Sequence, residues 1–345
     1  MDTLFRPTTL GPLTLKNRIV RSATNEHLSE SDGQLTQVWA DTLIELARNE
    51  VGLIISGHFC VDASQRADEG QPVLNADTSE ALLRCAADGV HRYGGKLLLQ
   101  LSHSGTKAME RVNGIPPKHP EDFTLSELDA LVDAFVLAAK RCQDCGVDGV
   151  QIHTAHSYLL SNFLNPVENL RTDEYGGVLE NRYRLIARIL SAVRGACGSG
   201  FAVLVKADCN GCGDLPALLR LYARSGVDGI EVSGTEFNCR AGQRSPFYLD
   251  ELLRARGTLS TPLILVGGIF SRQTAEDVLR HGIRLVSFSR ALIREPDFAA
   301  NLKSGVQEES RCRACNACYT IYRSRFVRCV QHTEKIPQLE KVFGR

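Results

Sequence analysis

The sequence lacks an excess of charge of either sign. Its 345 residues contain 40 lysines and arginines against 40 aspartates and glutamates, so the formal net charge is zero. A neutral chain has no bulk attraction for nucleic acids or for anionic membranes. We therefore expect neither of these polyanions as a partner.

The sequence also lacks long hydrophobic runs. No stretch reaches the roughly 20 apolar residues that cross a bilayer, and the opening MDTLFRPTTL has no apolar core of a secretory signal. No low-complexity tract and no linker rich in proline and glycine divides the chain. These features predict a soluble, cytoplasmic protein.

Cysteine, in contrast, is abundant, with 12 residues in the chain. A reducing cytoplasm does not support a disulfide framework, so clustered cysteines indicate metal or redox chemistry. The length allows one large α/β barrel or two modest domains.

Eight short apolar runs recur, and segments with helical spacing lie between them. The runs cover residues 18–23, 51–57, 96–101, 149–153, 202–207, 229–234, 262–268 and 285–290. Near-continuous Val, Ile and Leu is typical of strands buried on both faces. Eight strand–helix repeats predict a (β/α)₈ TIM barrel over residues 1–305, followed by a short cysteine-rich extension over 306–345. An open, doubly wound sheet is the alternative.

One of the helical segments covers residues 124–142. Ser126 is its expected N-terminal cap, with Asp129 in the first turn.

Chemistry in such barrels lies at the C-terminal ends of the strands and in the loops that follow. Polar residues at these ends should therefore converge. They are Ser22, Thr24, Asn25, His58, Cys60, Gln100, His103, His153, His156, Tyr158, Lys206, Asp208, Cys209, Gly267, Gly268, Ser289 and Arg290.

The ends of the last two runs, VGGIFSRQ and FSRALIRE, predict a phosphate site. Glycine-loop amides bind phosphate, barrel phosphate sites commonly follow strands seven and eight, and Arg290 adds a charged fork. The alternative is that Gly267 and Gly268 only form a tight turn.

The stretch QIHTAHSYLL places His153 and His156 two residues apart, just after a buried strand. The pair could bind a metal, donate hydrogen bonds to a substrate oxygen, or bond only to backbone carbonyls. No acidic ligand lies within the stretch, which favours donors over a metal site. Tyr158 is a plausible proton donor because a phenol keeps its proton at neutral pH.

Several segments together resemble the Old Yellow Enzyme family of FMN-dependent ene reductases. They are LFRPTTLGPLTLKNRIVRSAT, LLLQLSHSG, HTAHSYLLSNFLNP, RTDEYGG with ENRYRL, LVGGI and SRALIREPDF. The resemblance covers nearly the whole predicted barrel. It implies FMN bound across the strand ends, NAD(P)H as reductant, and reduction of the C=C bond of α,β-unsaturated carbonyl compounds.

The resemblance also implies individual roles. The residues implied for FMN are Ser22, Ala23, Thr24, Asn25, Cys60, Gln100, Lys206, Gly267, Gly268, Ser289 and Arg290. His153 and His156 would hold the substrate carbonyl oxygen and Tyr158 would protonate the α-carbon. Lys206 stands where the family usually has arginine. Ser157 and Ser289 stand where it usually has glycine, and Asn25 stands where many members have cysteine.

The C-terminal cysteines Cys312, Cys315 and Cys318 stand at two-residue intervals, and Cys329 follows. This spacing is typical of a [4Fe–4S] site, while four thiolates could also hold zinc or remain unligated. Larger family members, such as 2,4-dienoyl-CoA reductase, carry a cluster just after the barrel. We therefore expect the chain to belong to this cysteine-bearing subgroup. In those larger members the spacing between the second and third cysteines is one residue longer than it is here.

Other classes of function stay open at this point. An iron–sulfur reductase could receive electrons from a partner protein instead of from nicotinamide. A metal-dependent barrel lyase could use His153 and His156 as ligands, and a sensor could use the cysteines as a redox switch. The family resemblance implies a homo-oligomer and a small-molecule substrate.

Overall fold

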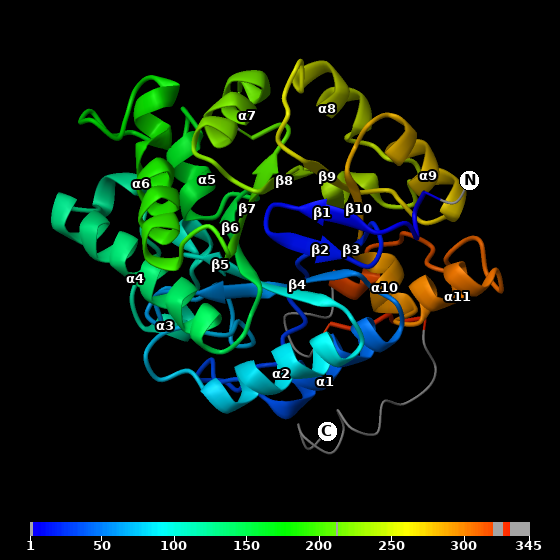
Figure 1. Ribbon diagram of the computed structural model, residues 1–345. Helices are drawn as coiled ribbons and strands as arrows, with labels where there is room; N and C mark the ends of the chain where they lie inside the picture. The colour runs from blue at the N-terminus through cyan, green and yellow to red at the C-terminus, as the bar shows by residue number, and fades with distance from the viewer. Residues whose placement is uncertain (1–2, 212, 320–326, 332–345) are drawn as a thin grey trace.

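The computed structural model describes residues 3–211, 213–319 and 327–331. Eight parallel strands close into a barrel in chain order, with the last strand pairing with the first (Figure 1). The strands are β3 (Ile19–Arg21), β4 (Leu53–Cys60), β5 (Lys96–Ser102), β6 (Gly149–Thr154), β7 (Ala202–Asp208), β8 (Gly229–Ser233), β9 (Leu263–Val266) and β10 (Leu285–Phe288). Each begins within one of the eight apolar runs, so the predicted (β/α)₈ barrel is confirmed.

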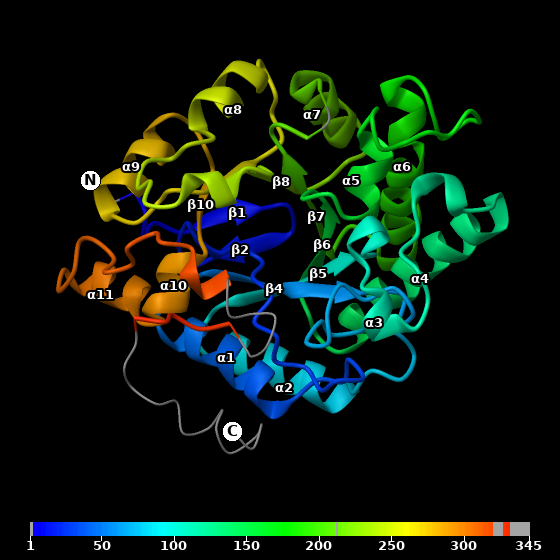
Figure 2. The same cartoon turned by 180° about the vertical axis from the view of Figure 1, so that it is seen from behind.

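Helices surround the barrel, as Figures 1 and 2 show from opposite sides. The larger ones are α1 (Gln37–Arg48), α2 (Glu80–Arg92), α4 (Leu125–Asp144), α6 (Leu179–Cys197), α7 (Leu215–Arg224), α8 (Leu249–Ala255), α9 (Arg272–Arg280) and α11 (Phe298–Ser304). Shorter ones are α3 (Glu110–Asn113), α5 (Leu159–Leu164) and α10 (Arg290–Arg294). A continuous apolar layer fills the space between the strands and these helices, because parallel strands bury both of their faces.

Helix α4 begins two residues earlier than the predicted cap at Ser126 implied. Its cap is Thr124, whose hydroxyl accepts a hydrogen bond from the Glu127 amide at 3.2 Å. The Glu127 carboxylate accepts in return from the Thr124 amide at 2.8 Å. This reciprocal pair satisfies two amides at the helix start, so the prediction that Ser126 caps the helix was wrong.

A hairpin that the sequence analysis did not predict closes one end of the barrel. Strands β1 (Thr8–Leu10) and β2 (Leu13–Leu15) pair antiparallel before β3 begins. Leu10, Leu13 and Leu15 are buried against residues at the starts of the barrel strands, among them Leu53 and Leu285. Figure 1 shows the blue hairpin across this end. The open end is therefore the one where the strands finish.

The described part of the C-terminal segment packs on the barrel beside α10 and α11 (Figures 1 and 2). The Ser310 amide donates to the Phe270 carbonyl at 2.7 Å, and the Ala314 carbonyl accepts from the Gly242 amide at 2.9 Å. Val327 reaches the N-terminal loop, where its amide donates to the Glu26 carbonyl at 2.8 Å. The boundary at residue 306 stays a prediction.

None of the helices in the described ranges is both long enough and apolar enough to cross a membrane.

Candidate active site

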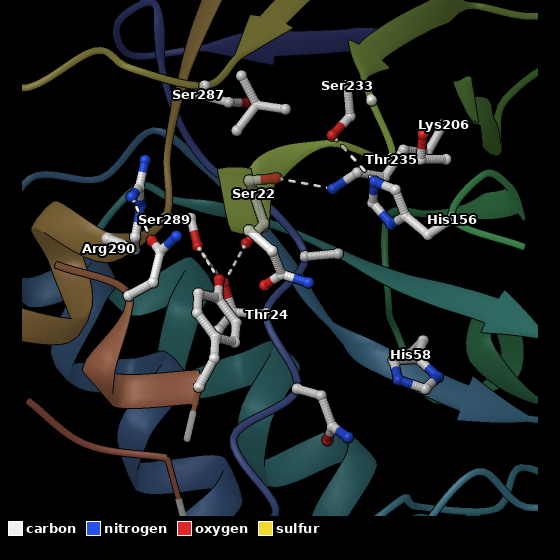
Figure 3. A pocket seen from close by; sticks show the side chains of 18 of the residues that line it. Ser22, Thr24, His58, His156, Lys206, Ser233, Thr235, Ser287, Ser289 and Arg290 are labelled. Carbon is white, nitrogen blue, oxygen red and sulfur yellow. Dashed lines mark hydrogen bonds between the residues drawn. The ribbon is translucent and has the colours of Figure 1, made fainter. Parts of the chain in front are cut away.

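A cavity of about 920 Å³ lies at the C-terminal ends of the barrel strands. Its volume is in the range of small-molecule sites. The predicted strand-end and site residues that line it are Ser22, Ala23, Thr24, Asn25, His58, Gln100, His153, His156, Tyr158, Lys206, Gly267, Gly268, Ser289 and Arg290. Figure 3 shows ten of the lining residues by label, drawn from several strands.

Strand register explains why these residues meet. His58 pairs with Gln100 across β4 and β5, and His153 pairs with Lys206 across β6 and β7. Lys206 in turn pairs with Glu231 on β8. Because paired residues of parallel strands lie side by side, residues distant in sequence become neighbours at one level of the barrel.

A chain of polar contacts crosses the barrel beneath the cavity. Gln100 Nε2 donates to Gln151 Oε1 at 2.7 Å, and Gln151 Nε2 donates to Glu231 Oε2 at 3.0 Å. Lys206 Nζ lies 3.3 Å from Glu231 Oε2 and donates to Ser22 Oγ at 2.9 Å. Figure 3 shows the contact between Lys206 and Ser22. These contacts fix the side-chain amide of Gln100, because its nitrogen donates to Gln151. The amide oxygen of Gln100 is then left to accept a hydrogen bond from a ligand.

Glu231 and Lys206 form a buried ion pair. The two side chains are 0% and 4% exposed. Burial alone would raise the pKa of Glu231, but the adjacent Lys206 ammonium and side-chain hydrogen bonds, among them the one from Gln151, together outweigh burial and leave this pKa below its ordinary value. Glu231 therefore stays ionised and compensates the charge of Lys206 inside the barrel.

Three histidines and a tyrosine form a compact ring cluster on one side of the cavity. The ring centroid of His153 lies 5.2 Å from the centroid of His156, 4.8 Å from that of Tyr158 and 6.0 Å from that of His58. His58 and Tyr158 stand edge to face at 4.8 Å. The cluster combines β4 with the end of β6 and the loop after it.

Burial keeps these imidazoles neutral. Desolvation lowers the pKa of His58 to about 4 and that of His156 to about 3. It also lowers the pKa of His153 well below its usual range, helped by the neighbouring His156. His153 Nδ1 is buried without a hydrogen-bond partner, while His156 Nε2 lies 3.0 Å from Ser233 Oγ. A neutral imidazole retains one N–H group that can donate to a substrate oxygen.

Two successive residues just before Tyr158 have a left-handed backbone conformation. His156 has φ +63° and Ser157 has φ +58°, a region that L-residues rarely occupy in succession. The glycine usual in the family at position 157 would adopt this conformation without strain. The serine nevertheless leaves Tyr158 in the cavity wall.

The predicted phosphate end contains two glycines that the backbone requires. Gly267 has φ +114° and Gly268 has φ +77°. A β-carbon on Gly267 would lie 2.7 Å from the Phe247 ring, and one on Gly268 would overlap the Ser245 carbonyl oxygen. The tight turn is therefore real, and it also brings backbone to the cavity wall.

The C-terminal segment orients Arg290. Its Nη1 donates to the Ala314 carbonyl at 3.2 Å and to Asn316 Oδ1 at 2.5 Å. Arg290, Cys315 and Asn316 all line the cavity, so the cysteine-rich segment contributes directly to its wall.

Cys60 is not among the residues that line the cavity, and its contact with the flavin stays a prediction. Its thiol donates to the Asp62 and Gln65 carbonyls at 3.1 and 3.3 Å, which holds it inside the following loop. Burial raises the pKa of this thiol to about 12. His58, two residues earlier, is the β4 residue that reaches the cavity.

Three further strand-end residues also lie outside the wall. His103 Nδ1 accepts from the Gly105 amide at 3.1 Å, and Cys209 is buried in the core. Asp208 Oδ2 accepts from the His156 amide at 2.6 Å, so Asp208 supports the histidine loop from behind.

Sequence reasoning missed several residues of the wall, including Ser233, Thr235, Tyr248, Ser287, Asn316 and Tyr319. Ser287 carried a signal, because it is a polar residue inside the apolar run of β10. Its Oγ is buried with no hydrogen-bond partner. The sequence around Tyr319 gave no signal of its place in the wall. Only the folded C-terminal segment brings it to Ser289, with 3.3 Å between the two hydroxyls.

The four C-terminal cysteines border one small cavity beside Arg290 and Arg294. Cys312 is buried, Cys318 and Cys329 are half-buried, and Cys315 is exposed. Within residues 3–211, 213–319 and 327–331, no group of three or more His, Cys, Asp or Glu side chains is arranged to hold a metal ion. The four cysteines border the same cavity, and metal ligation stays a prediction.

The main cavity suits FMN in the chemistry of its two ends. A lysine and an amide oxygen lie near one end, and backbone glycines with an arginine lie near the other. Ser287 Oγ, His153 Nδ1 and Tyr248 Oη are buried polar atoms without partners in the described chain, and all three residues line the cavity. Such atoms are expected where a polar ligand completes the hydrogen bonding.

Comparison with known proteins defines the class. The family model of the NADH:flavin oxidoreductase / NADH oxidase family matches residues 3–208. The chain is 32% identical over 314 residues to an NADPH dehydrogenase of Geobacillus sp. (strain WCH70), covering 85% of this chain and 91% of that protein. The chain therefore belongs to the NADH:flavin oxidoreductase family, and the predicted resemblance is confirmed. FMN and NAD(P)H are the cofactors that this membership implies.

Longer proteins also match. The chain is 28% identical over 342 residues to an NADH oxidase of Thermoanaerobacter brockii, covering 91% of this chain and 52% of that protein. A solved structure of a 2-naphthoyl-CoA reductase with 2-naphthoyl-CoA has a TM-score of 0.88 at 20% identity, covering 95% and 56% of the two chains. The chain thus spans about half the length of some relatives and most of others.

A second family model, that of dihydrouridine synthase, matches residues 132–345. It overlaps the first model over residues 132–208.

Proposed function

We propose that this chain is an FMN-dependent oxidoreductase that reduces the C=C bond of small α,β-unsaturated carbonyl compounds with hydride from NAD(P)H. The observation that carries the proposal is the ring cluster of His153, His156 and Tyr158 in the wall of a cavity whose other walls suit FMN. FMN, when bound, supplies the transfer of hydride to the β-carbon.

His153 and His156 hold the substrate carbonyl oxygen in this proposal. Both imidazoles are neutral because burial lowers their pKa values, so each presents an N–H donor without adding a buried charge. As hydride adds to the β-carbon, negative charge develops on this oxygen. Preorganised donors in a dry site stabilise such a charge strongly.

Tyr158 gives its proton to the α-carbon. It lies in the same wall as the two histidines, so a carbonyl oxygen held by them would place the α-carbon within reach of the phenol. Proton transfer from a positioned side chain typically accelerates such a step about 10²–10⁴-fold.

Lys206, Gln100 and the phosphate end bind the cofactor. Lys206 places a positive charge, and Gln100 an amide oxygen, at the end proposed for the flavin ring. Gly267, Gly268, Ser289 and Arg290 form the end proposed for the phosphate. With FMN bound, the positive charge of Lys206 would stabilise negative charge on the flavin ring.

The test is a variant with His153→Asn and His156→Asn together. We expect it to bind FMN and to be reduced by NADPH or NADH at the wild-type rate, while turnover of cyclohexenone falls at least about 10²-fold, as for loss of an oxyanion donor. His281→Asn is the control, because His281 is an exposed residue at the end of α9. Undiminished enone reduction in the double variant would refute the proposed function.

A second candidate is a reductase that receives single electrons from a partner protein through an iron–sulfur cluster. Cys315 favours it, since this residue borders both the cysteine cavity and the main cavity. Cys312, Cys315, Cys318 and Cys329 would be the ligands, with zinc as the alternative metal.

Metal analysis and flavin bleaching, both measured on protein purified without oxygen, distinguish the hydride-driven reductase, the partner-fed reductase and the lyase. Iron and sulfide near four atoms each per chain, with no bleaching of the flavin by NADH or NADPH, would favour the partner-fed reductase. Rapid bleaching would favour direct hydride transfer. A colourless protein that contains a divalent metal and refuses FMN would favour a lyase.

The dihydrouridine synthase match raises a nucleic-acid substrate as a further possibility. The formal net charge of zero gives no electrostatic support for binding a polyanion. We therefore retain small carbonyl compounds as the proposed substrates.

A further inference from the structure

His58 contacts the proposed proton donor directly. Its Nε2 lies 3.2 Å from the hydroxyl oxygen of Tyr158, and the side chains meet edge to face. His58 belongs to β4, whereas Tyr158 follows β6. The contact therefore joins a rigid strand to the loop that carries the proton donor.

The other side of the His58 ring is held by Gln71. Gln71 Nε2 lies 2.6 Å from His58 Nδ1. The orientation of this amide is fixed, because Gln71 Oε1 accepts from the Ala67 amide at 2.6 Å and from Ser104 Oγ at 3.1 Å. Gln71 is fully buried, so no solvent competes for these bonds.

These contacts determine where the proton of His58 resides. An amide nitrogen can only donate, so His58 Nδ1 must accept. Ser102 Oγ also lies 3.2 Å from His58 Nδ1, but its hydroxyl hydrogen goes to the Phe59 carbonyl at 3.1 Å and its oxygen accepts from Gln71 Nε2 at 3.3 Å, so Gln71 remains the group that donates to Nδ1. Neutral His58 consequently carries its hydrogen on Nε2 and donates it to the oxygen of Tyr158.

We propose that His58 is a positioning residue, locked by Gln71 as an Nε2–H donor, that orients the Tyr158 hydroxyl and stabilises the phenolate left after proton transfer. The inference rests on the proposed function, in which Tyr158 protonates the α-carbon. Since the tyrosine oxygen accepts from His58, its own hydrogen points away from His58. In the transfer the O–H bond breaks, a C–H bond forms at the α-carbon, and the electron pair stays on oxygen. Water later returns the proton.

The lock also excludes a different role. To pass a proton on to Tyr158, His58 would have to gain one at Nδ1 while losing one at Nε2. The Gln71 amide hydrogen occupies Nδ1. His58 therefore acts through its fixed hydrogen bond and not as a proton relay.

Three variants test the proposal. His58→Phe removes the donor and keeps a ring. His58→Gln can restore an N–H near the position of Nε2. Gln71→Glu keeps the bonds from Ala67 and Ser104 but turns the group facing Nδ1 into an acceptor, so that the histidine proton moves to Nδ1.

The first readout does not depend on turnover. Nitrogen-15 NMR of histidine-labelled protein should show one imidazole with its proton on Nε2 that is lost in His58→Phe, and Gln71→Glu should move that proton to Nδ1. A wild-type His58 protonated on Nδ1 would overturn the proposal, whether or not the protein reduces enones.

The second readout is kinetic. In His58→Phe and Gln71→Glu we expect turnover of cyclohexenone to fall about tenfold to a hundredfold, the range for loss of a hydrogen bond to a charged group. The solvent deuterium isotope effect should rise with it, and His58→Gln should recover part of the rate. Reoxidation by ferricyanide, which needs no carbon protonation, should stay at the wild-type rate.

The outcomes remain distinguishable. Wild-type protein that binds FMN but never reduces an enone would refute the proposed function, while the NMR result would still decide the tautomer. Normal enone turnover with an unchanged isotope effect in His58→Phe would refute the role of His58. If His58→Phe fails to fold, Gln71→Glu carries both readouts.

Discussion

Replacing Glu231 by glutamine tests the buried charge pair at the base of the cavity. Glu231 is fully buried and lies 3.3 Å from Lys206, whose side chain is 4% exposed. The substitution keeps the shape of the side chain but leaves the Lys206 ammonium without its counter-ion. Removing one partner of a buried ion pair costs about 3–5 kcal/mol of unfolding free energy, because the other charge stays desolvated. Lys206→Met should cost a similar amount for the same reason.

The double variant provides the decisive comparison. With both charges gone, no uncompensated ion remains, and the loss should be far smaller than the sum of the two single losses. The assay is urea unfolding of the four cofactor-free proteins at pH 7, with equal m-values as the check on two-state behaviour. Losses that add to within about 0.5 kcal/mol would show that the two residues are not coupled and would refute the reasoning.

Three other outcomes are expected. Burial raises the pKa of Asp208 from its ordinary value of 3.8 to about 7, so the folded protein keeps a proton that the unfolded chain loses. Stability should fall as pH rises from about 4 to about 7, and Asp208→Asn should remove this part of the pH profile in denaturant titrations. Gly268→Ala should lower the melting temperature far more than Gly114→Ala. Both have left-handed φ near +75°, but only at position 268 would the β-carbon meet backbone; equal losses would contradict the argument. Ser157→Gly should stabilise the fold by about 0.5–1 kcal/mol in the same assay, since φ is +58°, and a loss would show that the serine side chain is needed.

The barrel was predictable because its signal is local and repeated. Each strand is a short apolar run between helical segments, and eight repeats fit few folds. The β1–β2 hairpin was not predictable in this way. Its strands have three residues each, which is too few to show the alternation of apolar and polar residues typical of a strand. Its leucines are buried only because the end of the barrel lies against them.

The site was predictable where residues follow strand ends and less so elsewhere. The rule for barrels identified His153, Lys206 and Gln100, but it could not tell Cys60 from His58, since both fall at the end of β4. His58 pairs with Gln100 at the level of the cavity, whereas Cys60, two residues further on, pairs with Ser102 and its thiol bonds to the Asp62 and Gln65 carbonyls. Gln71 lies on a loop without a motif, and only its fully buried amide reveals its part in fixing His58.

Arg290 joins two parts of the site that the sequence treats as separate. Its guanidinium lines the cavity at the proposed phosphate end, yet one of its nitrogens is bonded to Ala314 and Asn316 between the cysteines. The guanidinium is planar and rigid, so fixing one nitrogen fixes the direction of the others. A change at Cys312 or Cys315 that moves the 312–316 backbone must therefore move the arginine. Loss of a cysteine should weaken FMN binding even in protein that holds no metal, because the segment orients a group at the proposed cofactor site.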